Sequence, residues 1–181
     1  MNDLLGVPDP AAAPSLRWGI IAPGGIANKF AEAVSRFTAG QVVAVSSRDE
    51  ARARAFAERH GIPRAYAGYE ALGADAEVDA VYVASPHSAH WEHAVAMAQA
   101  GKHVLIEKAL ARNGVEVDEI FDAAQAAGVF AMEAMWTRHL PHIAAVRRWI
   151  AEGRIGEVVT VAADHGQSLD LGPEHRLKAP E

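Results

Sequence analysis

Short apolar runs alternate with helical patterns along most of the chain. The apolar runs, which predict strands, cover 17–22, 41–47, 64–67, 78–85, 102–108 and 129–135. The helical patterns between and after them cover 26–37, 49–60, 91–100, 117–127 and 139–151. Runs without polar alternation are typical of parallel strands that are covered on both faces. Their alternation with helices through short connections predicts right-handed βαβ units and an α/β, doubly wound sheet of the Rossmann type.

A glycine follows each long helical pattern. These glycines are Gly40, Gly61, Gly101, Gly128 and Gly153. Glycine tolerates the left-handed conformation that closes a helix, so each is expected to end the helix before it. Unrelated helices and turns are the alternative interpretation, but the strand–helix rhythm holds through residue 135 and favours the sheet.

Three segments follow from this pattern. Residues 1–15 hold two acids and three prolines without a basic or apolar region, which predicts a flexible leader and not a signal peptide. Residues 16–135 are expected to form the dinucleotide-binding Rossmann domain. Residues 136–181 offer a linking helix and one β-branched strand at 157–164, which predicts the start of a truncated α/β substrate domain. Because one strand cannot form a sheet alone, we expect its completion by missing residues or by another copy of the chain, and hence a homo-oligomer.

The composition argues against a nucleic-acid-binding protein, a membrane protein and a protein with disulfides. The 181 residues carry a net charge of −6 and no basic stripe, which argues against nucleic-acid binding. No apolar run is long enough to cross a bilayer, so no membrane association is expected. The chain has no cysteine, which excludes disulfides and thiolate metal sites and fits a cytoplasmic location.

The stretch "WGIIAPGGIANKF" (18–30) has the outline of a nucleotide-binding turn between a strand and a helix. In the dinucleotide fingerprint, three small residues allow a tight turn, a close approach to the pyrophosphate and close helix packing. The segment that would serve consists of Ala22, Pro23, Gly24, Gly25, Ile26 and Ala27. Ala22 is the departure, and it would cost about 1 kcal/mol if the turn needed a positive φ there. By itself this stretch fits a plain β–α turn equally well.

The end of the second predicted strand bears on the choice of coenzyme. NAD enzymes place an acid there for the ribose 2′-hydroxyl, whereas this chain offers Ser46, Ser47 and Arg48 before Asp49. Hydroxyls and a guanidinium suit a 2′-phosphate, which favours NADP and leaves NAD possible. The alternative is that Ser47 caps the next helix and that Arg48 is solvated.

Glu107 and Lys108 follow a buried strand, at the edge that faces the ligand crevice of an open α/β sheet. A lysine there could act as general acid or base on a hydroxyl or carbonyl group. A solvated charge pair at a strand end is the other interpretation.

Three segments together resemble the Gfo/Idh/MocA oxidoreductase family: "GIIAPGGIA" (19–27), "ASPHSAHWEHAVAMAQAGKHVLIEKAL" (84–110) and "MEAMWTRHLP" (132–141). Within the family they are most similar to dimeric dihydrodiol dehydrogenases and NADP-dependent D-xylose dehydrogenases. The resemblance implies hydride transfer between a bound nicotinamide coenzyme and a CH–OH carbon of a sugar or cyclic diol. The family's second catalytic motif would follow residue 181, so the alternative is a truncated, inactive NADP-binding fragment.

The resemblance also assigns individual residues. Lys108 matches the lysine of the family's E-K-P motif, which assists proton transfer, and Glu107 matches its acid. Ala109 replaces the proline, and we expect a trans bond before it because cis costs about 3–4 kcal/mol there. The resemblance further places Ser85, Pro86, His87, His90, Trp136 and Arg138 along the coenzyme and active-site crevice.

Two further features have weaker meaning. His87, His90 and His93 are spaced by three, but that spacing drifts around a helix, so no metal site is expected. Glu133 lies in an apolar run and either faces the crevice or is a paired structural acid.

Overall fold

Six parallel strands form one sheet in the order β3-β2-β1-β4-β5-β6. The computed structural model describes residues 9–164 and residue 166. The strands are β1 (Arg17–Ile21), β2 (Gln41–Ser47), β3 (Arg64–Ala67), β4 (Ala80–Val83), β5 (His103–Ile106) and β6 (Ala131–Glu133). The helices are α1 (Gly25–Phe37), α2 (Glu50–His60), α3 (Glu70–Ala74), α4 (His90–Gln99), α5 (Gly114–Ala127) and α6 (Pro141–Ala151). This is the predicted Rossmann-type α/β fold, with its change of winding between β1 and β4.

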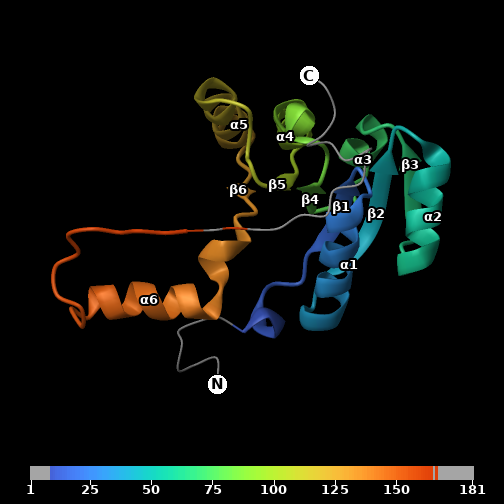
Figure 1. Ribbon diagram of the computed structural model, residues 1–181. Coiled ribbons are helices and arrows are strands. Elements are labelled where there is room, and N and C mark those ends of the chain that lie inside the picture. Colours follow the sequence, from blue (N-terminus) through green and yellow to red (C-terminus); the bar gives the residue numbers. More distant parts are fainter. Residues whose placement is uncertain (1–8, 165, 167–181) are drawn as a thin grey trace. The chain divides into compact units, whose positions relative to one another are not determined.

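Helices cover both faces of the sheet (Figure 1). On one face, α1 and α2 pack their apolar side chains against Ile20, Val45 and Tyr82. On the other face, α3, α4 and α5 pack against Ile21, Val81 and other strand residues. Successive strand residues therefore point to opposite helical layers, which is why the strands read as continuous apolar runs.

Gly19 lets α3 approach β1 closely. A Cβ atom at Gly19 would lie 3.0 Å from Leu72 Cδ1 and 3.1 Å from Val78 Cγ1. Both contacts are tighter than van der Waals distance, so only glycine fits this point of β1 without displacing its neighbours.

Arg17 joins the starts of β1 and β4. Its backbone N–H and Nε donate to Asp79 Oδ2 at 2.9 and 3.0 Å, and its Nη2 donates to Asp79 Oδ1 at 2.6 Å. Through the hydrogen bonds from Arg17, the pKa of Asp79 falls to about 2 despite partial burial. This pair holds together the two strands at which the winding changes.

Several local predictions are wrong. Gly40 is not left-handed; α1 ends at Phe37 with Thr38 as its C-cap, and Gly40 is needed because a Cβ would lie 3.0 Å from the Leu16 carbonyl oxygen. The other four glycines, Gly61, Gly101, Gly128 and Gly153, do have the predicted positive φ.

The short helix α3 was not predicted, because five residues are too few to establish a periodicity.

The predicted strand at 157–164 is absent, since none of these described residues is in a strand. A strand requires a paired neighbour, and no described strand pairs with this segment.

The chain divides into two compact units between Ala145 and Val146, within α6. Parts of the predicted leader (1–8) and of the predicted second domain (165 and 167–181) lie outside the described residues. The remaining leader contains a 3-10 turn, η2 (Pro10–Ala12). In the described part of the chain, no helix has the length and apolar character that crossing a membrane requires.

The packing at Gly19 predicts that Gly19→Ala lowers the free energy of unfolding by about 1–3 kcal/mol, because the added methyl overpacks the site. Gly114 is a matched control, since a Cβ there meets nothing within 4 Å. We expect Gly114→Ala to be neutral or to stabilise by up to about 1 kcal/mol. Urea unfolding followed by tryptophan fluorescence measures both, and equal effects of the two substitutions would contradict the packing argument.

The Arg17–Asp79 pair predicts a pH-dependent stability difference. The folded-state pKa of Asp79, about 2, lies below its unfolded value of about 4, so the stabilisation is complete above about pH 4 and is lost as the pH falls toward 2. Asp79→Asn should therefore lower the free energy of unfolding by about 1 kcal/mol at pH 7, a figure reduced for partial exposure, and by progressively less below pH 4. Urea titrations at several pH values test this, and a difference that stays constant down to pH 2.5 would be inconsistent with it.

Candidate functional site

The predicted site residues follow the carboxyl ends of four neighbouring strands. The loop at 22–25 follows β1, Arg48 follows β2, Ser85 to His87 follow β4, and Glu107 and Lys108 follow β5. Because the strands are parallel, these ends share one edge of the sheet. The change of winding between β1 and β4 opens a crevice at this edge in folds of this kind.

The loop after β1 presents free backbone donors. Ala22 has a φ of 63°, so the turn does need the left-handed conformation that the sequence made uncertain, and its N–H donates to the Ser46 carbonyl at 3.0 Å. Gly24 is the N-cap of α1 and makes no side-chain capping bond. By contrast, Asp49 caps α2 and Asn113 caps α5 through their side chains. The N–H groups of 24–27 therefore lack the capping side chain that α2 and α5 possess.

The end of β2 differs from the capping alternative. Ser47 does not cap α2; its Oγ accepts the Asp49 N–H at 3.2 Å, and Asp49 Oδ1 accepts the Arg52 N–H at 3.2 Å. Ser46 is fully buried and its Oγ has no hydrogen-bond partner among the described residues. Arg48 is exposed, and its side chain makes none of the ion pairs of the described structure.

His90 connects the segments that follow β4 and β5. Its ring is fully buried, with Nε2 2.8 Å from the Ser85 carbonyl oxygen and Nδ1 2.8 Å from the Ala109 carbonyl oxygen. The two ring nitrogens thus lie within hydrogen-bonding distance of carbonyl oxygens from two different segments. The exposed His87 contributes a third bond of this kind, with Nε2 2.8 Å from the Lys108 carbonyl oxygen. The two histidines therefore bind the turn that carries Lys108.

The peptide bond between Lys108 and Ala109 is cis, so the expected trans bond is wrong. The local preference of a bond before alanine favours trans. The sequence does not reveal the tertiary hydrogen bonds that His87 and His90 make to the carbonyl groups of Lys108 and Ala109.

Glu107 is held by two donors. Its Oε1 accepts the Tyr82 hydroxyl at 2.5 Å, and its Oε2 accepts the Lys108 backbone N–H at 3.1 Å. The side chain of Lys108 is exposed and makes no ion pair among the described residues, so its amine is not paired with Glu107. An exposed amine fits both the catalytic interpretation and that of a solvated charge. The Lys108 amine is thus left available at the sheet edge.

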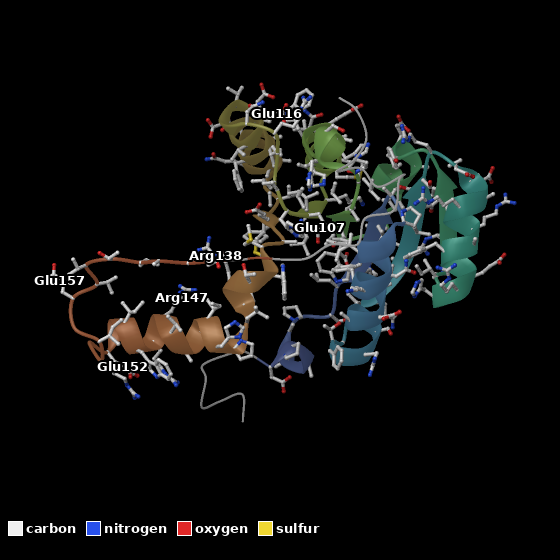
Figure 2. All side chains as sticks on the ribbon, viewed as in Figure 1. Glu107, Glu116, Arg138, Arg147, Glu152 and Glu157 are labelled. Atoms are coloured by element: carbon white, nitrogen blue, oxygen red, sulfur yellow. The ribbon has the colours of Figure 1, made fainter. Side chains whose placement is uncertain are left out.

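Two predicted residues make no hydrogen bond or ion pair with this cluster among the described residues. Trp136 and Arg138 lie in the 3-10 turn η4 (Trp136–His139), which follows β6, and both are exposed. In Figure 2, Glu107 lies among the central strands, while Arg138 lies in the segment beyond β6. Glu133 is a structural acid, since its Oε1 accepts the Leu110 N–H at 2.9 Å.

Two groups of contacts were missed in the sequence. Tyr82 looks like a core residue because it lies inside an apolar run, and only the structure reveals its bond to Glu107. Tyr69 and His93 form the other group: their rings meet edge to face at 4.3 Å, and His93 Nδ1 lies 3.0 Å from Ser85 Oγ. Burial lowers the pKa of His93, and the charge of Arg48 adds to this effect. No group of three metal-ligating side chains exists among the described residues.

Comparisons with known proteins agree with this geometry. The family model described as an oxidoreductase family with an NAD-binding Rossmann fold matches residues 16–135. The trans-1,2-dihydrobenzene-1,2-diol dehydrogenase of Danio rerio is 43% identical over 157 residues, which are 86% of this chain and 47% of the relative. The chain therefore spans about half the length of the curated relatives that it matches.

Solved structures share the sheet. An NAD-binding oxidoreductase from Klebsiella pneumoniae is 33% identical with a TM-score of 0.75, over 80% of this chain and 40% of that one. KijD10, a 3-ketoreductase from Actinomadura kijaniata in complex with NADP, is 35% identical with a TM-score of 0.72, over 80% of this chain and 46% of that one. The family match spans every strand of the sheet, and the chain belongs to the Gfo/Idh/MocA oxidoreductase family.

Proposed function

We propose that this chain binds NADP at the carboxyl edge of the sheet and belongs to an oxidoreductase that acts on a sugar or cyclic diol. The observation that carries the proposal is the start of α1, where the N–H groups of 24–27 have no side-chain cap. An anion is stabilised at such a terminus by these donors and by the helix dipole. The pyrophosphate of a dinucleotide fits this position at the change of winding.

Ser46, Ser47 and Arg48 support the choice of NADP over NAD. Arg48 is exposed at the end of β2, the position at which NAD enzymes hold an acid for the ribose. The guanidinium offers two parallel donors to a 2′-phosphate. The Ser47 Oγ, which accepts the Asp49 N–H, adds a hydroxyl group at this strand end. The Ser46 Oγ is fully buried and has no partner among the described residues, so it supports this strand end only from inside the fold. KijD10, a structural relative, was solved with NADP.

Lys108 is the proposed catalytic residue. A bound nicotinamide coenzyme supplies or accepts the hydride. Lys108 holds or moves the hydroxyl proton of the substrate, because its amine is exposed at the sheet edge and makes no ion pair among the described residues. Pro86, His87 and His90 shape and hold the turn around it, and Trp136 and Arg138 border the substrate side.

The substrate class comes from the relatives. The curated relatives are named as dehydrogenases of a trans-diol. A second candidate function is coenzyme binding without turnover, since the family match over residues 16–135 describes an NAD-binding Rossmann fold. NADPH oxidation or NADP reduction with D-xylose or a trans-diol separates the two candidates: turnover supports the oxidoreductase, whereas NADPH binding without turnover supports the second candidate.

We further propose self-association and a cytoplasmic location. Val159 and Val161, in the segment 157–164, are 89% and 81% exposed, and a second copy that pairs with this segment would cover them. The lack of cysteine in the whole chain fits a reducing compartment. Light scattering at high concentration tests the association, and a strictly monomeric chain would overturn it.

The proposed 2′-phosphate site predicts the effect of Arg48→Ala. NADPH should bind at least about tenfold more weakly, because a charge-assisted hydrogen bond contributes about 1.5–3 kcal/mol. NADH, which lacks the 2′-phosphate, should bind with less than about a twofold change. Quenching of tryptophan fluorescence measures both affinities.

Arg36→Ala is the matched control, because it removes the same charge from the last turn of α1, at the opposite edge of the sheet. It should leave both affinities unchanged. Equal losses for NADPH and NADH in Arg48→Ala, or no loss for either, would refute the role of Arg48 in selecting NADP.

A further inference from the structure

Tyr82 is a buried polar residue in the centre of the sheet, next to the turn that carries Lys108. It belongs to β4 and is 2% exposed. Its backbone lies directly opposite Leu105 of β5, and Glu107 follows Leu105 by two residues in the sequence. Side chains two residues apart in a strand lie on the same face of the sheet, so Glu107 is on the face that carries the ring of Tyr82. The hydroxyl donates to Glu107 Oε1 at 2.5 Å.

The carboxylate of Glu107 has a donor on each oxygen. The Tyr82 hydroxyl occupies Oε1, and the Lys108 backbone N–H occupies Oε2. A carboxylate with both oxygens bonded has one orientation, whereas a half-exposed glutamate with a single weak partner samples several rotamers. Burial raises the pKa of Tyr82 most, and the neighbouring Glu107 raises it further. The Tyr82 hydroxyl therefore keeps its proton and remains a donor throughout the physiological pH range.

The ring of Tyr82 also contacts the helix whose start we assign to the pyrophosphate. It stacks on Phe30 of α1 with a centroid distance of 4.0 Å and an interplanar angle of 17°. Phe30 meets Trp18 of β1 edge to face at 5.2 Å. The Tyr82 ring is therefore held by packing against α1, and through Phe30 against β1, independently of its bond to Glu107.

We propose that Tyr82 is a positioning residue, which holds the Glu107 carboxylate and through it the Lys108 backbone in register with α1. Its role rests on the proposed function of Lys108, since it acts on the reaction only through that residue. Together with His87, which binds the Lys108 carbonyl, this arrangement fixes the N–H and C=O groups of the same residue. Tyr82 thereby sets the distance between the lysine and the helix that holds the coenzyme.

The test compares three variants of the chain without coenzyme by ¹H–¹⁵N NMR. Tyr82→Phe keeps the stacked ring and removes the hydroxyl, so the Lys108 amide resonance should shift and its exchange with solvent should accelerate by about tenfold, as expected for a weakened hydrogen bond to a charged group. Glu107→Gln should shift the same amide. The double variant should add little to either single change, because both remove one linked pair of bonds.

Tyr66→Phe is the matched control. The Tyr66 hydroxyl also donates to a carboxylate, Asp75 Oδ2 at 3.0 Å, but it belongs to β3, three strands away from β4. This variant is expected to leave the Lys108 amide unchanged even where its free energy of unfolding falls as much as that of Tyr82→Phe. A purely structural role for Tyr82 would change global stability without a selective change at Lys108.

Two results would overturn the proposal: an unchanged Lys108 amide in Tyr82→Phe, or equal changes in Tyr82→Phe and Tyr66→Phe. Neither depends on coenzyme, so failure of NADPH to bind the wild-type chain would refute the proposed function and leave this result standing. With NADPH present, Tyr82→Phe should bind it within about twofold of wild type, because Tyr82 makes no contact with the uncapped N–H groups.

Discussion

The parallel pairing of β1 with β2 on one side and with β4 on the other is the constraint on which the rest of the structure depends. Right-handed crossovers from these strands send α1 to one face of the sheet and α4 to the other. The loops that lead to the two helices therefore diverge at the carboxyl edge. Gly24 at the start of α1 and Ser85 after β4 come to lie on either side of that divergence. The Arg17–Asp79 pair secures the same two strands at the opposite edge.

A local electrostatic contrast develops at this edge although the chain is acidic overall. The uncapped start of α1, Arg48 and Lys108 all present positive charge or N–H donors there. The acids near these groups are engaged in structural bonds: Glu107 accepts the Tyr82 hydroxyl and the Lys108 N–H, and Asp49 accepts the Arg52 N–H at the start of α2. These donors belong to three segments that lie far apart in the sequence, and together they favour an anion at this edge.

Much of this fold was predictable because its signals are local. The strand at 41–47 has the predicted bounds, since a β-branched run between two polar ends marks both limits. Gly61 and Gly128 end their helices as predicted, because a left-handed cap is a property of one residue. The carboxyl ends of the strands also followed from parallel pairing, which placed the loop 22–27, Arg48 and Lys108 on one edge.

What was not predictable depends on contacts between distant residues. The Tyr82–Glu107 bond joins β4 to the residue after β5, and nothing in an apolar run distinguishes such a tyrosine from a core residue. The cis bond after Lys108 lies beside carbonyl groups that bind two histidines, whereas the sequence offers only the local preference against it. Residues 157–164 have the composition of a strand, but composition does not supply the neighbour that a strand needs.

The central claim is that the start of α1 holds the pyrophosphate of a dinucleotide. A ¹H–¹⁵N NMR titration of the labelled chain with NADPH tests it most directly, because each backbone amide reports its own environment. We expect the largest shifts on the amides of Gly24, Gly25, Ile26 and Ala27, and the next largest on the amide of Arg48. If the resonances of these amides stay unchanged while other resonances, such as those of α5, shift on addition of NADPH, the pyrophosphate does not bind at the start of α1.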